Sequence, residues 1–336
     1  MPNEENQFVD ATTLVDLQAS VQDKNAFAGL EDYLKIGKAF LTFLEETRLT
    51  RIISPTPPNN YIFYQYGADY ANKITRPLNS NLFIESPSIF VKSFERFVTF
   101  LADLKKHQEQ TAEREASREF LASREINKVI YTVQQSIGSI GDSFRDSNQA
   151  RKRIGQLFER FIKLIIREVG LECEPRTINL PIPNYPSYTM SYELDVVFSR
   201  NKAVLTSETK TLYPMEIVGS VKTTSKDRID KIFLDKYLLT KLLGRNIPVV
   251  AVFLHDVQRA TRGKSIFGIA STFKTNHFLG YSLVLNKLDG VYYVDPRPEM
   301  ASNERLREQI QDFQHFLVAD LWTLSEPVPI KSDTNI

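Results

Sequence analysis

The sequence predicts an α/β (α+β) fold, in which a mixed β-sheet flanked by helices follows an N-terminal helical region. Apolar residues have helical spacing in residues 10–48, whereas residues 192–294 alternate between short apolar runs and one helical run. Such alternation is typical of a sheet whose faces are covered by helices. At 336 residues we expect two units, a mainly helical region over residues 1–125 and a sheet-containing domain over residues 126–336.

The N-terminal region is expected to be helical around a short aromatic segment. In chain order, the pattern predicts helices over residues 10–48, a proline break at 55–58, an aromatic core run at 61–66, a helix over 88–106 and a charged, helix-prone link at 109–124. Gly138, Gly141 and Ser143 then indicate a loop.

The remaining elements alternate between helices and strands. The pattern predicts a helix over residues 149–169, a proline-rich loop over 175–186, strands at 192–198 and 215–224, a helix over 227–243, a strand at 248–254, strands at 281–285 and 291–294, and a closing helix over 303–321. Trp322 is expected in the core.

Scarce residue types exclude several classes of protein. Cys173 is the single cysteine, so intramolecular disulfides and thiolate zinc sites are excluded, which suits a cytoplasmic protein. The four histidines lack metal-binding spacing, and the 13 glycines form no phosphate-binding loop. The first residues are unlike a signal peptide, and no apolar run reaches the ~18 residues that cross a bilayer. We therefore expect no membrane partner.

The net charge of +1 hides an uneven distribution. Residues 145–167 carry seven bases and two acids, and residues 257–276 carry four bases and no acid. Both ends of the chain are acidic, with net charges of −5 over residues 1–48 and −4 over residues 299–326. The basic middle is either a set of solvated faces or a groove for a polyanion such as nucleic acid.

Two predicted strands carry the residues with the clearest chemistry. Asp195 lies among apolar residues of the first strand, and Lys222 lies near the end of the second. Because side chains alternate along a strand, Ser220 and Lys222 point to the same side. A carboxylate can hold Mg²⁺, and a lysine beside the scissile phosphate can orient or deprotonate water and offset negative charge. The pair therefore indicates metal-dependent phosphodiester hydrolysis.

The Asp195…Ser220-Val221-Lys222 pattern resembles the PD-(D/E)xK nuclease motif, with Ser220 in place of the second acid. In restriction endonucleases that recognise CCGG or CCNGG, the following helix supplies that acid, and Asp235 has the similar position here. The resemblance also implies a glutamate in the helix before the Asp195 strand, which matches Glu159. It implies a restriction-endonuclease-like sheet, with Asp195 and Asp235 as the Mg²⁺ ligands.

A second element of this resemblance follows the lysine. Lys226, Asp227 and Arg228 match the family's Arg-(Asp/Glu)-Arg element, which reads C:G pairs in the major groove, although Lys226 lacks the bidentate fork of arginine. The spacing is most similar to the CCNGG-cutting subgroup. The resemblance covers residues 150–256 and implies a type II restriction endonuclease that cuts double-stranded DNA 5′ of the first C as a homodimer, with residues 1–125 contacting flanking DNA or the second subunit.

Each site residue also has a simpler interpretation. Asp195 could be a buried structural acid, Lys222 a strand-edge lysine, Asp235 a solvated helix residue, and Glu159 half of a helical ion pair with Lys163. Glu193 and Glu216 are competing acids, although Glu216 lies ~20 Å along the strand from Lys222. His255, beside Asp256, is expected at the surface rather than in a catalytic triad.

Two other functions remain open. One is a repair or recombination nuclease of the same fold that recognises DNA structure. The other is a catalytically silent DNA-binding module.

Overall fold

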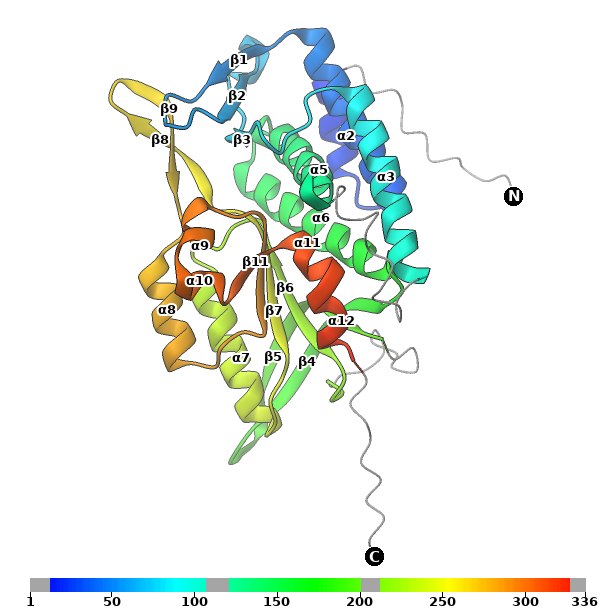
Figure 1. Cartoon of the computed structure of the whole chain (residues 1–336), viewed down its shortest axis with the longest axis vertical. Helices are drawn as coiled ribbons and strands as arrows, with labels where there is room; N and C mark the ends of the chain where they lie inside the picture. The colour runs from blue at the N-terminus through cyan, green and yellow to red at the C-terminus, as the bar shows by residue number, and fades with distance from the viewer. Residues whose placement is uncertain (1–12, 107–120, 201–211, 327–336) are drawn as a thin grey trace, which may run out of the picture.

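The N-terminal part of the chain is a helical assembly that also carries a small sheet. The computed structural model describes residues 13–106, 121–200 and 212–326 (Figure 1). The helices of this part are α1 (Leu14–Gln22), α2 (Leu30–Thr47), α3 (Pro87–Lys106), α5 (Glu125–Asp142) and α6 (Ser147–Glu168). Strands β1 (Thr50–Ile53), β2 (Tyr61–Gln65) and β3 (Leu78–Asn79) form the small sheet, and a 3₁₀ turn (Ala68–Tyr70) follows β2. The aromatic run 61–66 is buried in β2 and the residue after it, as expected, except for half-buried Gln65.

A six-stranded mixed sheet forms the second part of the molecule. Its strands are β4 (Glu172–Ile182), β5 (Tyr185–Ser199), β6 (Ile217–Lys222), β7 (Val249–His255), β10 (Gly290–Asp295) and β11 (Ile310–Asp312). The strand order is β11-β10-β7-β6-β5-β4. Strands β6, β7, β10 and β11 are parallel, whereas β4 and β5 are antiparallel to their neighbours. The predicted mixed sheet is confirmed.

Helices cover both faces of this sheet. One face packs on α5, α6 and the C-terminal segment, which comprises α11 (Phe313–His315), a π-helical turn (Phe316–Asp320) and α12 (Leu321–Leu324). The other face packs on α7 (Ile229–Leu243), α8 (Thr275–Val284), α9 (Pro298–Ser302) and α10 (Glu304–Arg307). Neighbouring strand residues alternate between the two cores, with Val250 and Val252 facing α6 and Ala251 and Phe253 facing α7. Trp322 is buried, as predicted.

Four expectations about the elements are wrong. Gly138 and Gly141 lie inside α5, where Gly138 leaves room for the side chain of Arg76, which is paired with Asp142. Residues 172–182 form β4 despite their prolines, because this strand is at the edge of the sheet and pairs with β5 alone.

The other two errors concern the C-terminal third. Residues 281–284 belong to α8, where Phe278 and Tyr281 contact Phe233 of α7. The predicted closing helix is interrupted by β11, which pairs with β10. Residues 109–120 of the predicted link lie outside the described residues.

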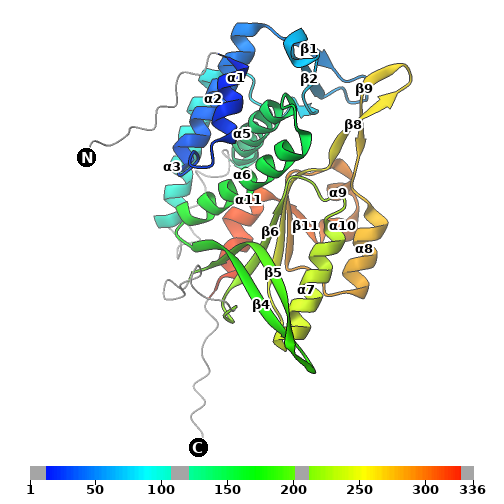
Figure 2. The same ribbon diagram turned by 180° about the vertical axis from the view of Figure 1, so that it is seen from behind.

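A two-stranded hairpin projects from the sheet edge at which the parallel strands end. It consists of β8 (Val257–Arg262) and β9 (Ser265–Ser271), and it lies beside the small N-terminal sheet in both views (Figures 1 and 2). Sequence patterning did not predict it. No helix among the described residues is long and apolar enough to span a bilayer.

Candidate active site

Lys222 lies between two carboxylates at the end of β6. Its Nζ atom is 2.5 Å from Oδ2 of Asp195 on β5 and 3.0 Å from Oε1 of Glu159 on α6. All three side chains are partly buried, with 17 to 29% of each side chain exposed. The helical ion pair of Glu159 with Lys163 is absent, because Lys163 binds Glu174 instead. The structure therefore brings together three of the predicted residues.

The pairing of β5 with β6 places Asp195 at this position. Val196 pairs with Gly219, and a Cβ atom on Gly219 would lie 2.6 Å from the Val196 side chain, so glycine permits this close approach. Oδ2 of Asp195 accepts hydrogen bonds from the Val221 N–H at 2.8 Å and from the Ser220 hydroxyl at 3.2 Å. Ser220 and Lys222 thus reach the same carboxylate, as strand alternation predicts. These bonds fix the orientation of Asp195.

The electrostatics of the cluster favour a charged lysine. Burial alone would lower the pKa of Lys222, but the carboxylates of Asp195 and Glu159 outweigh it and raise that pKa. The pKa of Glu159 is raised by burial and then by the negative charge of Asp195, while Lys222 opposes the shift. At neutral pH, Lys222 is therefore an ammonium group.

Asp235 approaches the cluster from the opposite face of the sheet. It lies on α7, its side chain is half-buried, and its pKa is raised by burial and by Asp195, with Lys231 and Lys222 opposing. Within the described residues, no hydrogen bond or ion pair joins Asp235 to Lys222 or Asp195. No three Asp, Glu, His or Cys side chains in that part of the chain lie close enough to hold a metal by themselves.

Lys226, Asp227 and Arg228 form an exposed turn between β6 and α7. Asp227 has a φ of +55°, a left-handed conformation that aspartate tolerates better than most residues. The Arg228 N–H donates to the Ser225 carbonyl at 3.0 Å, and Nζ of Lys226 donates to Oε1 of Gln258 on β8 at 3.1 Å. All three side chains are accessible to a ligand that lies along this edge of the sheet.

A buried carboxylate anchors the turn. Asp256 is fully buried just after β7 and accepts hydrogen bonds from the hydroxyls of Thr224 at 2.7 Å, Thr272 at 3.1 Å and Tyr293 at 2.7 Å. The Ser225 N–H donates to it at 2.9 Å, and the Ser225 hydroxyl also donates to it. Asp256 therefore holds the start of the turn against β9 and β10. Sequence reasoning missed this role, although an aspartate directly after a buried strand was a usable signal.

Of the two competing acids, Glu216 has a structural role and Glu193 is exposed. The carboxylate of Glu216 binds Arg176 in a buried bidentate pair, at the end of β6 remote from Lys222. Glu193 is exposed on β5.

The expectation that His255 is a surface residue is wrong. Its side chain is buried at the end of β7, burial lowers its pKa to about 3, and its Nδ1 accepts from the Val257 N–H at 3.1 Å. Because Asp256 is committed to the turn, the pair forms no catalytic triad with a nucleophile.

Much of the positive charge of residues 145–167 is used within the chain. Arg153 donates to the carbonyls of Val21 and Asp23, and Arg160 donates to that of Ala26 at 3.1 Å. Lys163 and Arg167 both pair with Glu174. These four cations hold α6 to the N-terminal segment and to β4, so they do not form a free polyanion groove.

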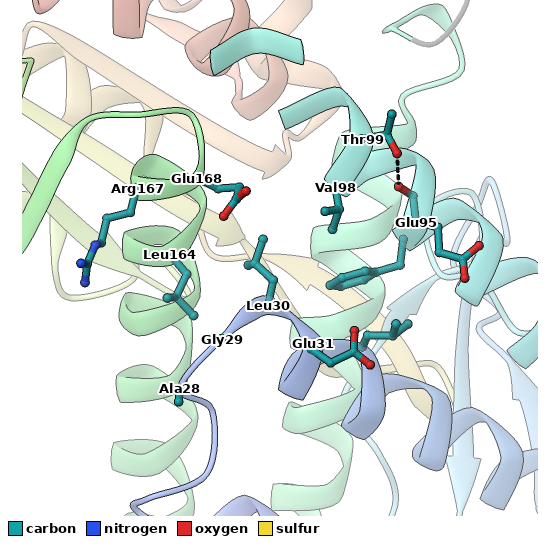
Figure 3. Close-up of a pocket in the computed structure, with 12 residues that line it drawn as sticks. Ala28, Gly29, Leu30, Glu31, Glu95, Val98, Thr99, Leu164, Arg167 and Glu168 are labelled. Carbon is teal, nitrogen blue, oxygen red and sulfur yellow. Dashed lines mark hydrogen bonds between the residues drawn. The ribbon is translucent and has the colours of Figure 1, made fainter. Parts of the chain in front are cut away.

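A cavity of about 790 Å³ lies between α2, α3 and α6, apart from the predicted site residues (Figure 3). Its lining combines apolar side chains such as Leu30 and Leu164 with the carboxylates of Glu31, Glu95 and Glu168. Its acids make it unsuited to a polyanion.

Comparison with known proteins supports the architecture of the chain. No protein-family model and no curated protein matches the sequence. Among solved structures, the chain is similar to the one described as the type IIP restriction endonuclease Kpn2I. The TM-score is 0.64 at 18% sequence identity, over 94% of this chain and 97% of that one. The chain has a restriction-endonuclease fold. The predicted fold class is thereby confirmed.

Proposed function

We propose that this protein is a type II restriction endonuclease that hydrolyses double-stranded DNA. The observation that carries the proposal is the position of Lys222 between Asp195 and Glu159, at the end of β6 in a restriction-endonuclease fold. The target is a palindrome with a CCGG or CCNGG core, with CCNGG favoured, and the cut lies 5′ of the first C. This target and cut position rest on the residue resemblance.

In this mechanism, Lys222 acts as a fixed positive charge. The carboxylates of Asp195 and Glu159 hold its ammonium group in place and keep it protonated. An ammonium group beside the scissile phosphate donates hydrogen bonds and offsets the negative charge that develops as water adds to phosphorus. Asp195 is oriented by Ser220 and Val221, so its other oxygen can face the substrate.

The chemistry of the donor set suits Mg²⁺, which prefers oxygen ligands. Asp195 and Asp235 would hold the ion, with Glu159 in support. Mg²⁺ commonly binds one or two carboxylates and takes its remaining ligands from water and substrate phosphate. This fits a site where the described part of the chain groups no three metal-binding side chains closely enough to hold an ion by themselves. When bound, the ion supplies positive charge for the phosphate and acidifies bound water.

The exposed turn is assigned to sequence recognition. Asp227 can accept a hydrogen bond from cytosine N4, and Lys226 and Arg228 can donate to guanine O6 and N7. A palindromic site contains two equivalent half-sites, and each chain carries one Lys222 cluster. A two-fold homodimer therefore places one cluster on each strand.

Cleavage of plasmid DNA tests the proposal. We expect the purified chain and Mg²⁺ to produce discrete bands, and sequencing of the new ends to give the site and the position of the cut. The Lys222→Ala variant should produce none of these bands. Absence of cleavage with Mg²⁺, Mn²⁺ or Ca²⁺ would reject the endonuclease, whereas products that depend on DNA structure and not on sequence would indicate a repair nuclease.

A further inference from the structure

The β8–β9 hairpin carries free positive charge close to the site. Arg259, Arg262 and Lys264 are all exposed, and residues 257–276 contain no acid. Among the described residues, none of these three cations is within ion-pair distance of a carboxylate. They differ in this respect from Arg153, Arg160, Lys163 and Arg167 of α6, which are bound within the chain.

The hairpin is held firmly on one side. The Ile269 N–H donates to Oγ1 of Thr56 at 3.1 Å, and the rings of Phe267 and Phe63 have centroids 5.7 Å apart. Val257 and Ile269 are buried in a small core shared with β2. This packing holds the hairpin in place against the small N-terminal sheet, so its exposed cations are carried by an ordered two-stranded ribbon.

Gly268 makes space for the side chain of one of these cations, Arg262. A Cβ atom on Gly268 would lie 2.4 Å from Cγ of Arg262 and 2.7 Å from the Ala260 carbonyl, so the Arg262 side chain crosses β9 where glycine leaves space. Arg262 then joins Arg124 and Arg297 in lining a cavity of about 500 Å³ beside the hairpin. Arg297 is paired with Glu299 and Arg124 donates to the Val294 carbonyl, so the free positive charge beside this cavity comes from Arg262. Asp295 is a buried acid that also lines the cavity.

The hairpin is connected directly to the turn assigned to base recognition. Gln258 of β8 accepts from Lys226, and the Thr272 N–H, just after β9, donates to the Asp256 carbonyl at 3.0 Å. A duplex that lies over residues 226–228 therefore meets β8 next. A two-stranded ribbon has the width that a DNA groove accepts, and arginine and lysine are the usual partners of its phosphates.

We propose that the β8–β9 hairpin binds the phosphate backbone of the duplex flanking the bases read by residues 226–228. The inference rests on the proposed function, because it assumes that DNA lies along this edge of the sheet. The contact neutralises phosphates through Arg259 and Lys264 and carries no base specificity of its own. It extends the footprint of the protein beyond the recognised core.

Equilibrium binding without divalent metal tests this contact separately from cleavage. Fluorescence anisotropy would compare the wild type with the Arg259→Ala/Lys264→Ala variant on duplexes with and without a CCNGG core. We expect affinity to fall about tenfold or more at 0.1 M salt, by the same factor on both duplexes. The slope of log K against log salt should become shallower by about 1.8, which corresponds to two lost phosphate contacts.

The matched control is Lys241→Ala/Lys287→Ala, which removes two exposed cations at the opposite end of the sheet. This control should leave both the affinity and the salt slope unchanged. An unchanged slope in the hairpin variant would overturn the inference, as would a loss confined to the CCNGG duplex, which would indicate base reading. If the wild type cleaves DNA in either case, the proposed function stands; if it neither binds nor cleaves DNA, the proposed function fails.

Discussion

The ammonium nitrogen of Lys222 lies 2.5 Å from Oδ2 of Asp195, and the same oxygen accepts the Val221 N–H at 2.8 Å. The two side chains therefore hold each other in one geometry. We expect Lys222→Ala to reduce the cleavage rate about 10²- to 10³-fold, because a fixed positive charge at the phosphate is lost.

Single-turnover cleavage of a short duplex would measure this effect. Binding of the same duplex serves as the control and should change far less than the rate, since Lys222 is half-buried. A cleavage rate within tenfold of the wild type would contradict the role assigned to Lys222.

The raised pKa values of Glu159 and Asp235 predict a pH dependence. Both carboxyls bind protons at a higher pH than ordinary acids, so activity should fall on the acid side as both lose their negative charge. Because two groups titrate, the slope of log rate against pH on the acid side should be greater than the slope that one titrating group produces. In the Glu159→Gln variant, we expect a lower maximal cleavage rate and an acid-side slope that corresponds to one titrating group.

Cleavage rates measured at saturating Mg²⁺ from acid to neutral pH would provide this profile. The matched substitution Glu193→Gln changes an exposed glutamate on β5 and should leave the profile unchanged. An unaltered acid limb in Glu159→Gln would show that Glu159 does not titrate in the reaction.

Asp256 should be important for stability and for the recognition turn. Its buried carboxylate accepts several hydrogen bonds, and hydrogen bonds to a charged group contribute ~1.5–3 kcal/mol each. We expect Asp256→Ala to lower the free energy of unfolding by about 3 kcal/mol or more, since the donors lose their shared acceptor.

Urea denaturation would measure this loss, and Thr272→Val would be the control. That variant removes a single donor and should cost about 1 kcal/mol. Hydrogen exchange should also report faster opening of residues 224–228 in folded Asp256→Ala. Equal stabilities of the two variants would contradict the anchoring role.

The buried pair of Arg176 and Glu216 provides a stability test away from the site. Both side chains are almost fully buried, with exposures of 2% and 0%. Arg176→Met leaves Glu216 buried without its partner and should destabilise the fold by about 3–5 kcal/mol. Adding Glu216→Leu should recover much of this loss, because both charges are then absent.

Chemical unfolding of the wild type, the two single variants and the double variant completes the cycle. Cleavage by the folded double variant should be close to normal, because Glu216 and Lys222 are at opposite ends of β6. Strong loss of cleavage in that variant would return Glu216 to the list of candidate acids.

Strand patterning placed Asp195 and Lys222 on neighbouring strands, because chain order and side-chain alternation largely determine which side chains meet in a sheet. The resemblance to the nuclease family, and not strand patterning, indicated Glu159 on the preceding helix. Prediction from the sequence failed where a contact with a distant part of the chain determines the local arrangement. Gly138 lies inside α5, where its missing side chain leaves space for distant Arg76. Arg153 and Arg160 are bound by carbonyls that lie more than a hundred residues away. The β8–β9 hairpin was missed because its exposed strand lacks a clear apolar alternation.

The parallel arrangement of β6, β7 and β10 has a consequence for how the connections between the strands can diverge. The turn at residues 226–228 follows β6, which ends at Lys222, and the β8–β9 hairpin follows β7 and Asp256. Residues 295–298, at and after the end of β10, line the cavity beside the hairpin. Insertions or substitutions in one such connection leave the hydrogen-bonded strand core and the other two connections in place. Descendants of this chain can therefore change the connection that we propose to read DNA while inheriting the same Lys222, Asp195 and Glu159 cluster.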